Sequence, residues 1–167
     1  MPITYQGKQV IWQPDSQIVA FQPTAFQNET ATRVNLVMRA SQQAVESLTA
    51  LDQYIVNYSV QNSETLFGKT LSIEEVKLRY SPSLKQSEKG YEPTFKAKIN
   101  LSGRGKLNCW DTDGKQRDAP DSWIGTSVQP RMILKCLWIM PKEFGCLFDC
   151  SDALIAETSP ENTTCPF

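Results

Sequence analysis

The sequence predicts a β-rich α+β fold, in which a barrel of five or six strands carries one long and one short inserted helix. Residues 41–58 repeat apolar side chains at steps of three and four, and a shorter helical pattern follows at residues 72–80. From residue 92 onward the pattern switches to the period of two that is typical of strands. A strand, two helices and then a strand-rich half are the order expected of a small barrel with helical insertions.

Both predicted helices begin at a residue suited to cap them. Ser41 is a suitable N-cap for the long helix. The apolar stripe of this helix consists of Val45, Leu48, Leu51, Ile55 and Tyr58. Ser72 and Glu75 have the spacing of a capping box at the start of the short helix. Ser81 and Pro82 end that helix, because a residue before proline avoids the helical conformation.

Alternating side chains predict the strands. Two apolar runs at residues 10–12 and 18–21 are interpreted as strands or an extended arm. Residues 32–39 alternate around Val34, Leu36 and Met38, which indicates a half-buried strand. The residues expected to point inward from the next strands are Phe95, Ala97, Ile99, Leu101, Leu107 and Cys109.

Two further strands are predicted at residues 131–139 and 144–150. We expect Trp138 in the core, because it shares the parity of Met132, Leu134 and Cys136. Gly145 interrupts the last strand and is expected to mark a bulge or a sharp bend.

The chain has 167 residues, which fits one domain over residues 1–158 followed by a flexible polar tail at residues 159–167. No apolar run is long enough to span a membrane, and the first residues have no secretory pattern. Five cysteines, an odd number, indicate reduced thiols rather than disulfides. We therefore expect a protein of an intracellular, reducing compartment that is not secreted.

The composition lowers the expectation of an enzyme, although it does not exclude carboxylate or lysine chemistry. Histidine is absent, which excludes Ser-His and Cys-His nucleophile pairs. Cys146 and Cys150 would lie about 13 Å apart on one strand, too far for two ligands of one zinc ion. An acidic loop contains Asp111, Asp113, Asp118 and Asp121. We predict that the protein is not an enzyme and has no catalytic residue, metal site or cofactor. The alternative is an enzyme that uses this acidic loop.

The charges are unevenly distributed along the chain. Residues 69–142 contain 14 basic and 8 acidic residues, a balance of +6. The remaining segments contain 3 basic and 10 acidic residues, a balance of −7. A basic middle suggests a polyanionic partner, although a chance fluctuation in surface charge would produce the same numbers.

In the second half of the chain, the side chains expected to point outward include both cations and aromatic rings. Grooves that bind single-stranded nucleic acids combine the same two kinds of side chain. The candidate nucleic-acid-binding residues are Tyr91, Lys96, Lys98, Arg104, Lys106, Trp110, Arg131 and Lys135. An ordinary solvated sheet fits this pattern equally well, because its lysines would keep its edges from pairing with other sheets.

Several short motifs resemble a known family. The matching pieces are Phe67-Gly68-Lys69, Ser72-Ile73-Glu74-Glu75-Val76, Tyr80-Ser81-Pro82, the run 91–100, the turn 110–115, and Lys135, Leu137 and Trp138 before Phe144-Gly145. In this order they resemble the OB-fold single-stranded-DNA-binding proteins of large nucleocytoplasmic DNA viruses, and more distantly the replicative single-strand binders of tailed phages. The resemblance covers about half of the chain.

The resemblance implies an OB-like nucleic-acid-binding domain over residues 1–158. It implies sequence-independent binding and protection of single-stranded DNA during replication, recombination or repair, in the host cytoplasm or nucleus if the source is viral. The sequence does not decide whether RNA is a second ligand, or whether the protein forms a homodimer or a cooperative array on DNA. Pro166 and Phe167 resemble the end of tails that recruit replication proteins. The alternative function is a β-rich viral structural or assembly protein that binds protein.

Overall fold

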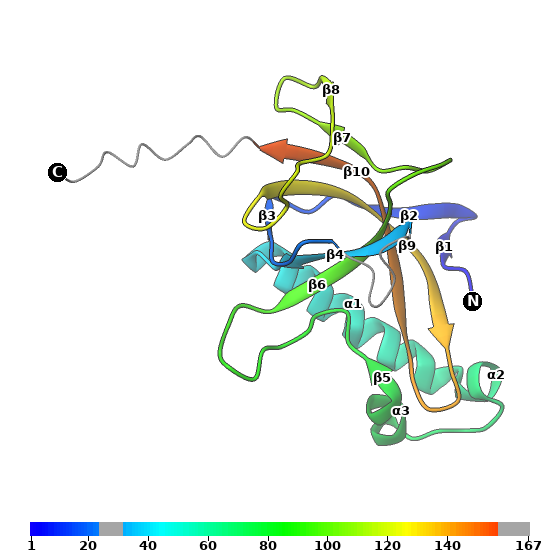
Figure 1. Cartoon of the computed structure of the whole chain (residues 1–167). Coiled ribbons are helices and arrows are strands. Elements are labelled where there is room, and N and C mark those ends of the chain that lie inside the picture. Colours follow the sequence, from blue (N-terminus) through cyan, green and yellow to red (C-terminus); the bar gives the residue numbers. More distant parts are fainter. Residues whose placement is uncertain (24–31, 157–167) are drawn as a thin grey trace.

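The computed structural model describes residues 1–23 and 32–156, so the predicted tail lies outside the described part of the chain. The helices are α1 Gln42–Gln61, α2 Ser63–Phe67 and α3 Ile73–Arg79. The strands are β1 Thr4–Tyr5, β2 Lys8–Trp12, β3 Gln17–Val19, β4 Arg33–Arg39, β5 Tyr80–Ser81, β6 Thr94–Asn100, β7 Asn108–Trp110, β8 Gln116–Arg117, β9 Ser127–Ile139 and β10 Phe144–Ala156. These ten strands form one mixed sheet (Figure 1), which confirms a β-rich fold with helices.

Five of the strands pair in a ring. β9 pairs with β3, β3 with β4, β4 with β6, and β6 with β10, which pairs back along β9. Only the pairing of β6 with β10 is parallel within this ring. The expectation of five or six strands is wrong for the whole sheet, because the short strands β1, β2, β5, β7 and β8 extend the ring.

The two predicted helices begin where their caps indicate. The Ser41 hydroxyl accepts a hydrogen bond from the Ala44 amide at 3.1 Å, and buried Gln17 ties Ser41 to β3. The capping box of Ser72 and Glu75 is present at α3. The prediction of two helices missed α2, which has five residues and is too short to show a helical period. No helix in the described ranges is long and apolar enough to cross a membrane.

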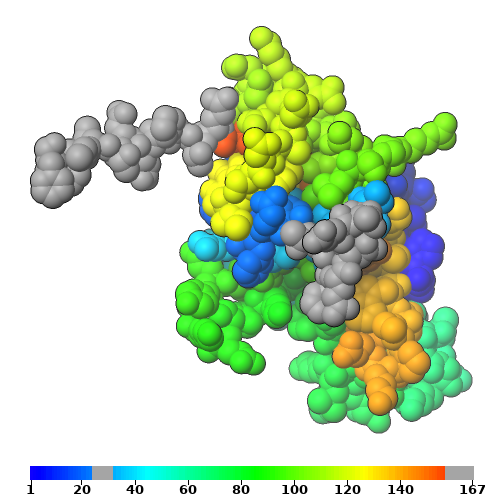
Figure 2. Space-filling view, in the orientation of Figure 1, coloured from blue at the N-terminus to red at the C-terminus, as the bar shows by residue number. Residues whose placement is uncertain are grey.

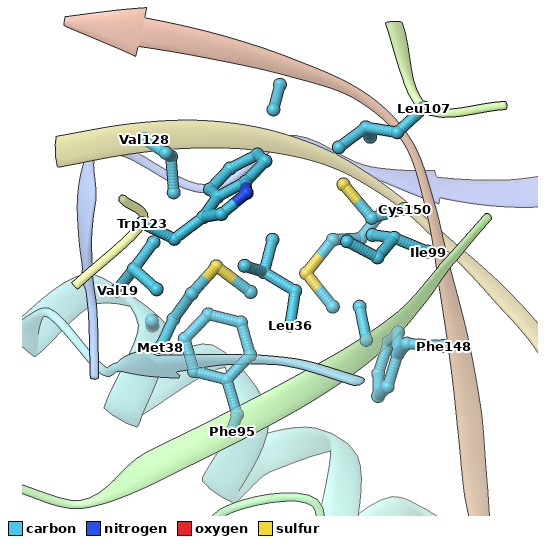
Figure 3. Packing of buried hydrophobic residues seen from close by; sticks show 14 of the residues in the cluster. Val19, Leu36, Met38, Phe95, Ile99, Leu107, Trp123, Val128, Phe148 and Cys150 are labelled. Atoms are coloured by element: carbon cyan, nitrogen blue, oxygen red, sulfur yellow. The ribbon is translucent and has the colours of Figure 1, made fainter. Parts of the chain in front are cut away.

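Side chains from the ring of strands and from α1 form the main core (Figure 3). The inward positions of β4 and β6 are buried as predicted, with Leu36 and Ile99 both 0% exposed. Leu101 contradicts the prediction with 40% exposure, because β6 ends one residue earlier. A second cluster lies where α1, α3 and β5 meet the ends of β9 and β10, around Phe144.

A bulge in the hairpin of β9 and β10 overturns the predicted position of Trp138. Cys136 pairs with Leu147 but Leu134 pairs with Phe148, so Lys135 has no direct partner and the alternation of β9 reverses there. Trp138 is therefore half-buried on the opposite side from that expected, and it is not part of the core.

The expected bulge is absent at Gly145. This residue pairs regularly with Trp138 on one side and Ser81 on the other. A Cβ atom at Gly145 would lie 2.9 Å from the Trp138 ring and 3.0 Å from the Ser81 carbonyl oxygen. The glycine is required because the indole occupies the space of a side chain.

We predict that Gly145→Ala lowers the free energy of unfolding by about 1–3 kcal/mol, the usual cost of overpacking. Urea denaturation measures it. In a Trp138→Ala background the same substitution should cost less, because the two ring contacts are gone. An equal cost in both backgrounds would contradict this explanation of Gly145.

Candidate nucleic-acid interface

The candidate interface is the outward side of four neighbouring strands, β4, β6, β10 and β9, here called the outer face. Since alternate residues of β4 and β6 fill the core, the residues between them point outward. The register places Asn35 opposite Lys98 and Val37 opposite Lys96. Lys98 lies beside Asp149 of β10, so the face continues from β6 onto β10.

Asp149 connects the two outermost strands of the outer face, β4 and β9. Its Oδ1 accepts a hydrogen bond from Arg33 of β4 at 2.6 Å, and its Oδ2 accepts one from Lys135 of β9 at 3.0 Å. Burial lowers the pKa of Lys98, and the positive charges of Lys96 and Arg33 lower it further, while Asp149 acts in the opposite direction. Three cations from three strands therefore surround one carboxylate.

A second carboxylate, Asp152, lies three residues further along β10. The Trp110 indole Nε1 donates to Asp152 Oδ1 at 3.0 Å, and the Arg131 guanidinium lies 3.8 Å from Oδ2. Burial would raise the pKa of Asp152, but hydrogen bonds from Ser151, Trp110 and Asn108 and the charge of Arg131 lower it on balance. Trp110 is half-buried and held by this contact, rather than fully exposed at a strand edge.

The other predicted residues lie at opposite ends of β6. Lys106 forms a bridge to Asn100 at the end of the strand, and the exposed Arg104 precedes it in the same loop. Tyr91 is 73% exposed in the loop before Thr94, at the start of the strand. Tyr91 is thus separated from Lys106 by the length of β6.

The structure brings Lys98 and Lys135 together at Asp149, and Arg131 and Trp110 together at Asp152. Sequence reasoning did not select Arg33, although its parity in the strand 32–39 could have identified it as outward-facing. No sequence signal distinguished Asp149 from other acidic residues.

A cavity of about 220 Å³ opens on the outer face where β10 leaves β6. It is lined by Asn35, Ser81, Pro82, Ser83, Lys96, Ala97, Lys98, Trp138, Cys146, Leu147 and Phe148. β10 pairs with β6 only at Asp149 and with β5 at Phe144 and Gly145. The described strands include no partner for β10 between those points on this side, and the cavity occupies that gap.

Solved structures that are similar to this chain include two bacteriophage proteins. Gp2.5, a single-stranded DNA-binding protein encoded by bacteriophage T7, has a TM-score of 0.56 at 12% identity, over 89% of this chain and 86% of that chain. The single-stranded DNA-binding protein of bacteriophage Enc34, in complex with ssDNA, has a TM-score of 0.54 at 7% identity, over 92% and 93%. A C-terminal truncation of the Enc34 protein has a TM-score of 0.56 at 7% identity, over 93% and 94%.

No family model and no curated protein matches this sequence. At identities of 12% and below, the structural likeness shows a shared fold. The resemblance to phage single-strand binders is supported at that level. The attribution to large nucleocytoplasmic DNA viruses stays a prediction.

We predict that Asp152 contributes to stability in a pH-dependent way. Its folded-state pKa lies below the ordinary value of 3.8, so the contribution is present above that value and is lost as the pH falls through the folded pKa. Asp152→Asn should therefore lower the urea midpoint at neutral pH and make it fall less on acidification. Asp113→Asn, in an exposed turn, is the control. Unchanged acid sensitivity in Asp152→Asn would contradict the role of this carboxylate.

Proposed function

We propose that this protein is a non-enzymatic binder of single-stranded DNA that holds the strand along the outer face without sequence preference. It would coat and protect exposed strands during replication, recombination or repair. The observation that carries the proposal is the convergence of Arg33, Lys98 and Lys135, from three different strands, around Asp149.

The order of strands supports an OB-like barrel for residues 1–158. In chain order the ring contains β3, β4, β6, β9 and β10, with the third and fifth strands parallel. OB-folds are five-stranded Greek-key barrels that bind oligonucleotides on the face of their second and third strands. In this chain those strands are β4 and β6, which carry Arg33, Lys96 and Lys98 on their outward side.

The cations of the outer face are free enough to meet phosphates. The side chains of Arg33 and Lys135 are 40% and 57% exposed, even while they contact Asp149. Such partly exposed ion pairs are worth about 0–1 kcal/mol, so exchanging the carboxylate for a phosphate costs little. Each phosphate neutralised releases counterions, which makes binding dependent on salt.

The similar solved proteins support the same ligand, since both are described as single-stranded DNA-binding proteins and one was solved with ssDNA. The acidic loop gives little support to an enzyme. The Asp111 carboxylate accepts hydrogen bonds from the amides of Asp113 and Lys115, so it shapes the turn. Burial raises the pKa of Cys150 to about 12, which keeps this thiol unreactive.

Further parts of the proposal concern partners. RNA is an alternative ligand for the outer face. A homodimer or a cooperative array on DNA would extend the binding surface beyond one chain. Recruitment of replication proteins through Pro166 and Phe167 rests on residues outside the described ranges. Free cysteines in the described chain fit a reducing, intracellular compartment.

We predict that Lys96→Glu with Lys98→Glu abolishes binding of single-stranded oligonucleotides at moderate salt, because two cations become anions beside the phosphates. Milder Lys→Gln changes at the same positions should reduce the slope of log K against log salt by about 1.4, or 0.7 for each lost contact. Fluorescence anisotropy with single- and double-stranded oligonucleotides measures both effects.

The matched control is Lys77→Glu with Lys115→Glu, which makes the same change in net charge on α3 and in the turn between β7 and β8. This control should bind almost as the unmodified protein does. Equal loss in both double variants would show a non-specific charge effect and overturn the proposed face. No binding to either kind of DNA would favour a structural protein that binds protein.

A further inference from the structure

The cavity between β6 and β10 has one flat and rigid wall. The Trp138 indole lies against Gly145, where a Cβ atom would come within 2.9 Å of the ring. This contact holds the ring in place, while Trp138 stays half-exposed and lines the cavity. A fixed aromatic surface loses little conformational entropy when a second ring stacks on it.

The remaining walls are complementary to a nucleotide. Leu147 and Phe148 supply apolar surface, and the cations Lys96 and Lys98 line the cavity. A base inside the cavity would therefore have its phosphate beside two positive charges. At about 220 Å³ the cavity fits a single ring system, being smaller than the roughly 300–1,000 Å³ of pockets for drug-sized ligands.

Asn35 adds an unsatisfied hydrogen-bonding group to this cavity. Its side-chain oxygen Oδ1 is buried and has no hydrogen-bond partner among the described residues. A buried acceptor without a partner costs free energy that a donating ligand can recover. Because every natural base has an N–H group on its pairing edge, this acceptor suits a base without selecting one sequence.

We propose that this cavity is a nucleobase subsite, in which one base of the bound strand stacks on Trp138 and donates an N–H hydrogen bond to Asn35 Oδ1. Lys96 and Lys98 hold the phosphate of the same nucleotide. The subsite rests on the proposed binding of single-stranded DNA and assigns stacking to Trp138, because Trp138 lines this cavity and Trp110 does not.

The test compares a thymine oligonucleotide with an abasic one of equal length, which has the same backbone charge and no bases. The unmodified protein should bind the thymine oligonucleotide more tightly, by roughly 5- to 100-fold for one stacked base. Trp138→Leu, which keeps an apolar side chain over Gly145, should lose most of this preference and retain its affinity for the abasic strand. Trp138→Phe should keep most of the preference, since it keeps an aromatic ring.

The rival position is tested by Trp110→Leu, at the half-exposed tryptophan of β7 beside Asp152, and this variant should keep the preference for bases. If Trp138→Leu retains the full preference, or if Trp110→Leu loses it instead, the subsite is overturned while the binding of single-stranded DNA stands. If the unmodified protein binds neither oligonucleotide, the proposed function itself fails.

A second measurement needs no variant at Trp138 and so does not depend on how such variants fold. Photocrosslinking of a 5-iododeoxyuridine oligonucleotide to the unmodified protein, followed by peptide mapping, should label Trp138 or its neighbours in the cavity wall. Labelling confined to Trp110, Tyr91 or residues away from the cavity would overturn the subsite. Asn35→Leu should weaken binding of the thymine oligonucleotide severalfold and leave the abasic strand unaffected.

Discussion

Strand β10 is the element on which the whole outer face depends. It pairs antiparallel with β9 along its length, and on its other side it pairs in parallel with β5, then β6, then β7. Three segments that are distant in sequence therefore meet along one strand. Asp149 lies at the contact with β6 and Asp152 at the contact with β7, which places one carboxylate beside each group of cations. The gap between the contacts with β5 and β6 forms the cavity.

Two irregularities in the hairpin of β9 and β10 decide which side chains reach this face. In an even strand, residues three apart point to opposite sides. The register shift between Cys150 and Asp152 inserts an extra residue, so Asp149 and Asp152 both point outward. The shift at Lys135 likewise turns Trp138 out of the core. A sheet without these bulges would bury one of the carboxylates and the indole that lines the cavity.

The same irregularities explain how far the sequence could predict the fold and the site. Alternation identified the buried side chains of β4 and β6, because neither strand contains a bulge over its length. The caps Ser41 and Ser72 located both longer helices, since capping depends on residues within one turn. Trp138 was misplaced because its orientation depends on a shift three residues earlier, which leaves no mark in the alternating pattern.

The candidate residues show the corresponding limit for the site. Lysines on β6 and β9 could be selected from parity alone, and Lys98 and Lys135 do lie beside the same carboxylate. Arg33 of β4 reaches across β6 to this carboxylate, which lies 116 residues later in the chain. The contact depends on two pairings between distant segments, that of β4 with β6 and that of β6 with β10. Such pairings are set by the whole topology, so local sequence patterns could not reveal them.

The placement of carboxylates among the cations has a physical consequence for binding. In the free protein Asp149 pairs with Arg33 and Lys135, and Asp152 lies beside Arg131. A face whose cations are already paired gains less from phosphates than a bare cationic face, because each contact exchanges one anion for another. This electrostatic gain also falls as salt rises. Stacking of a base on a fixed indole uses no charge, so its share of the binding energy grows with salt. The two bulges therefore serve different parts of the binding energy. The bulge at Lys135 exposes Trp138 for stacking, and the bulge between Cys150 and Asp152 turns Asp152 outward, beside Arg131.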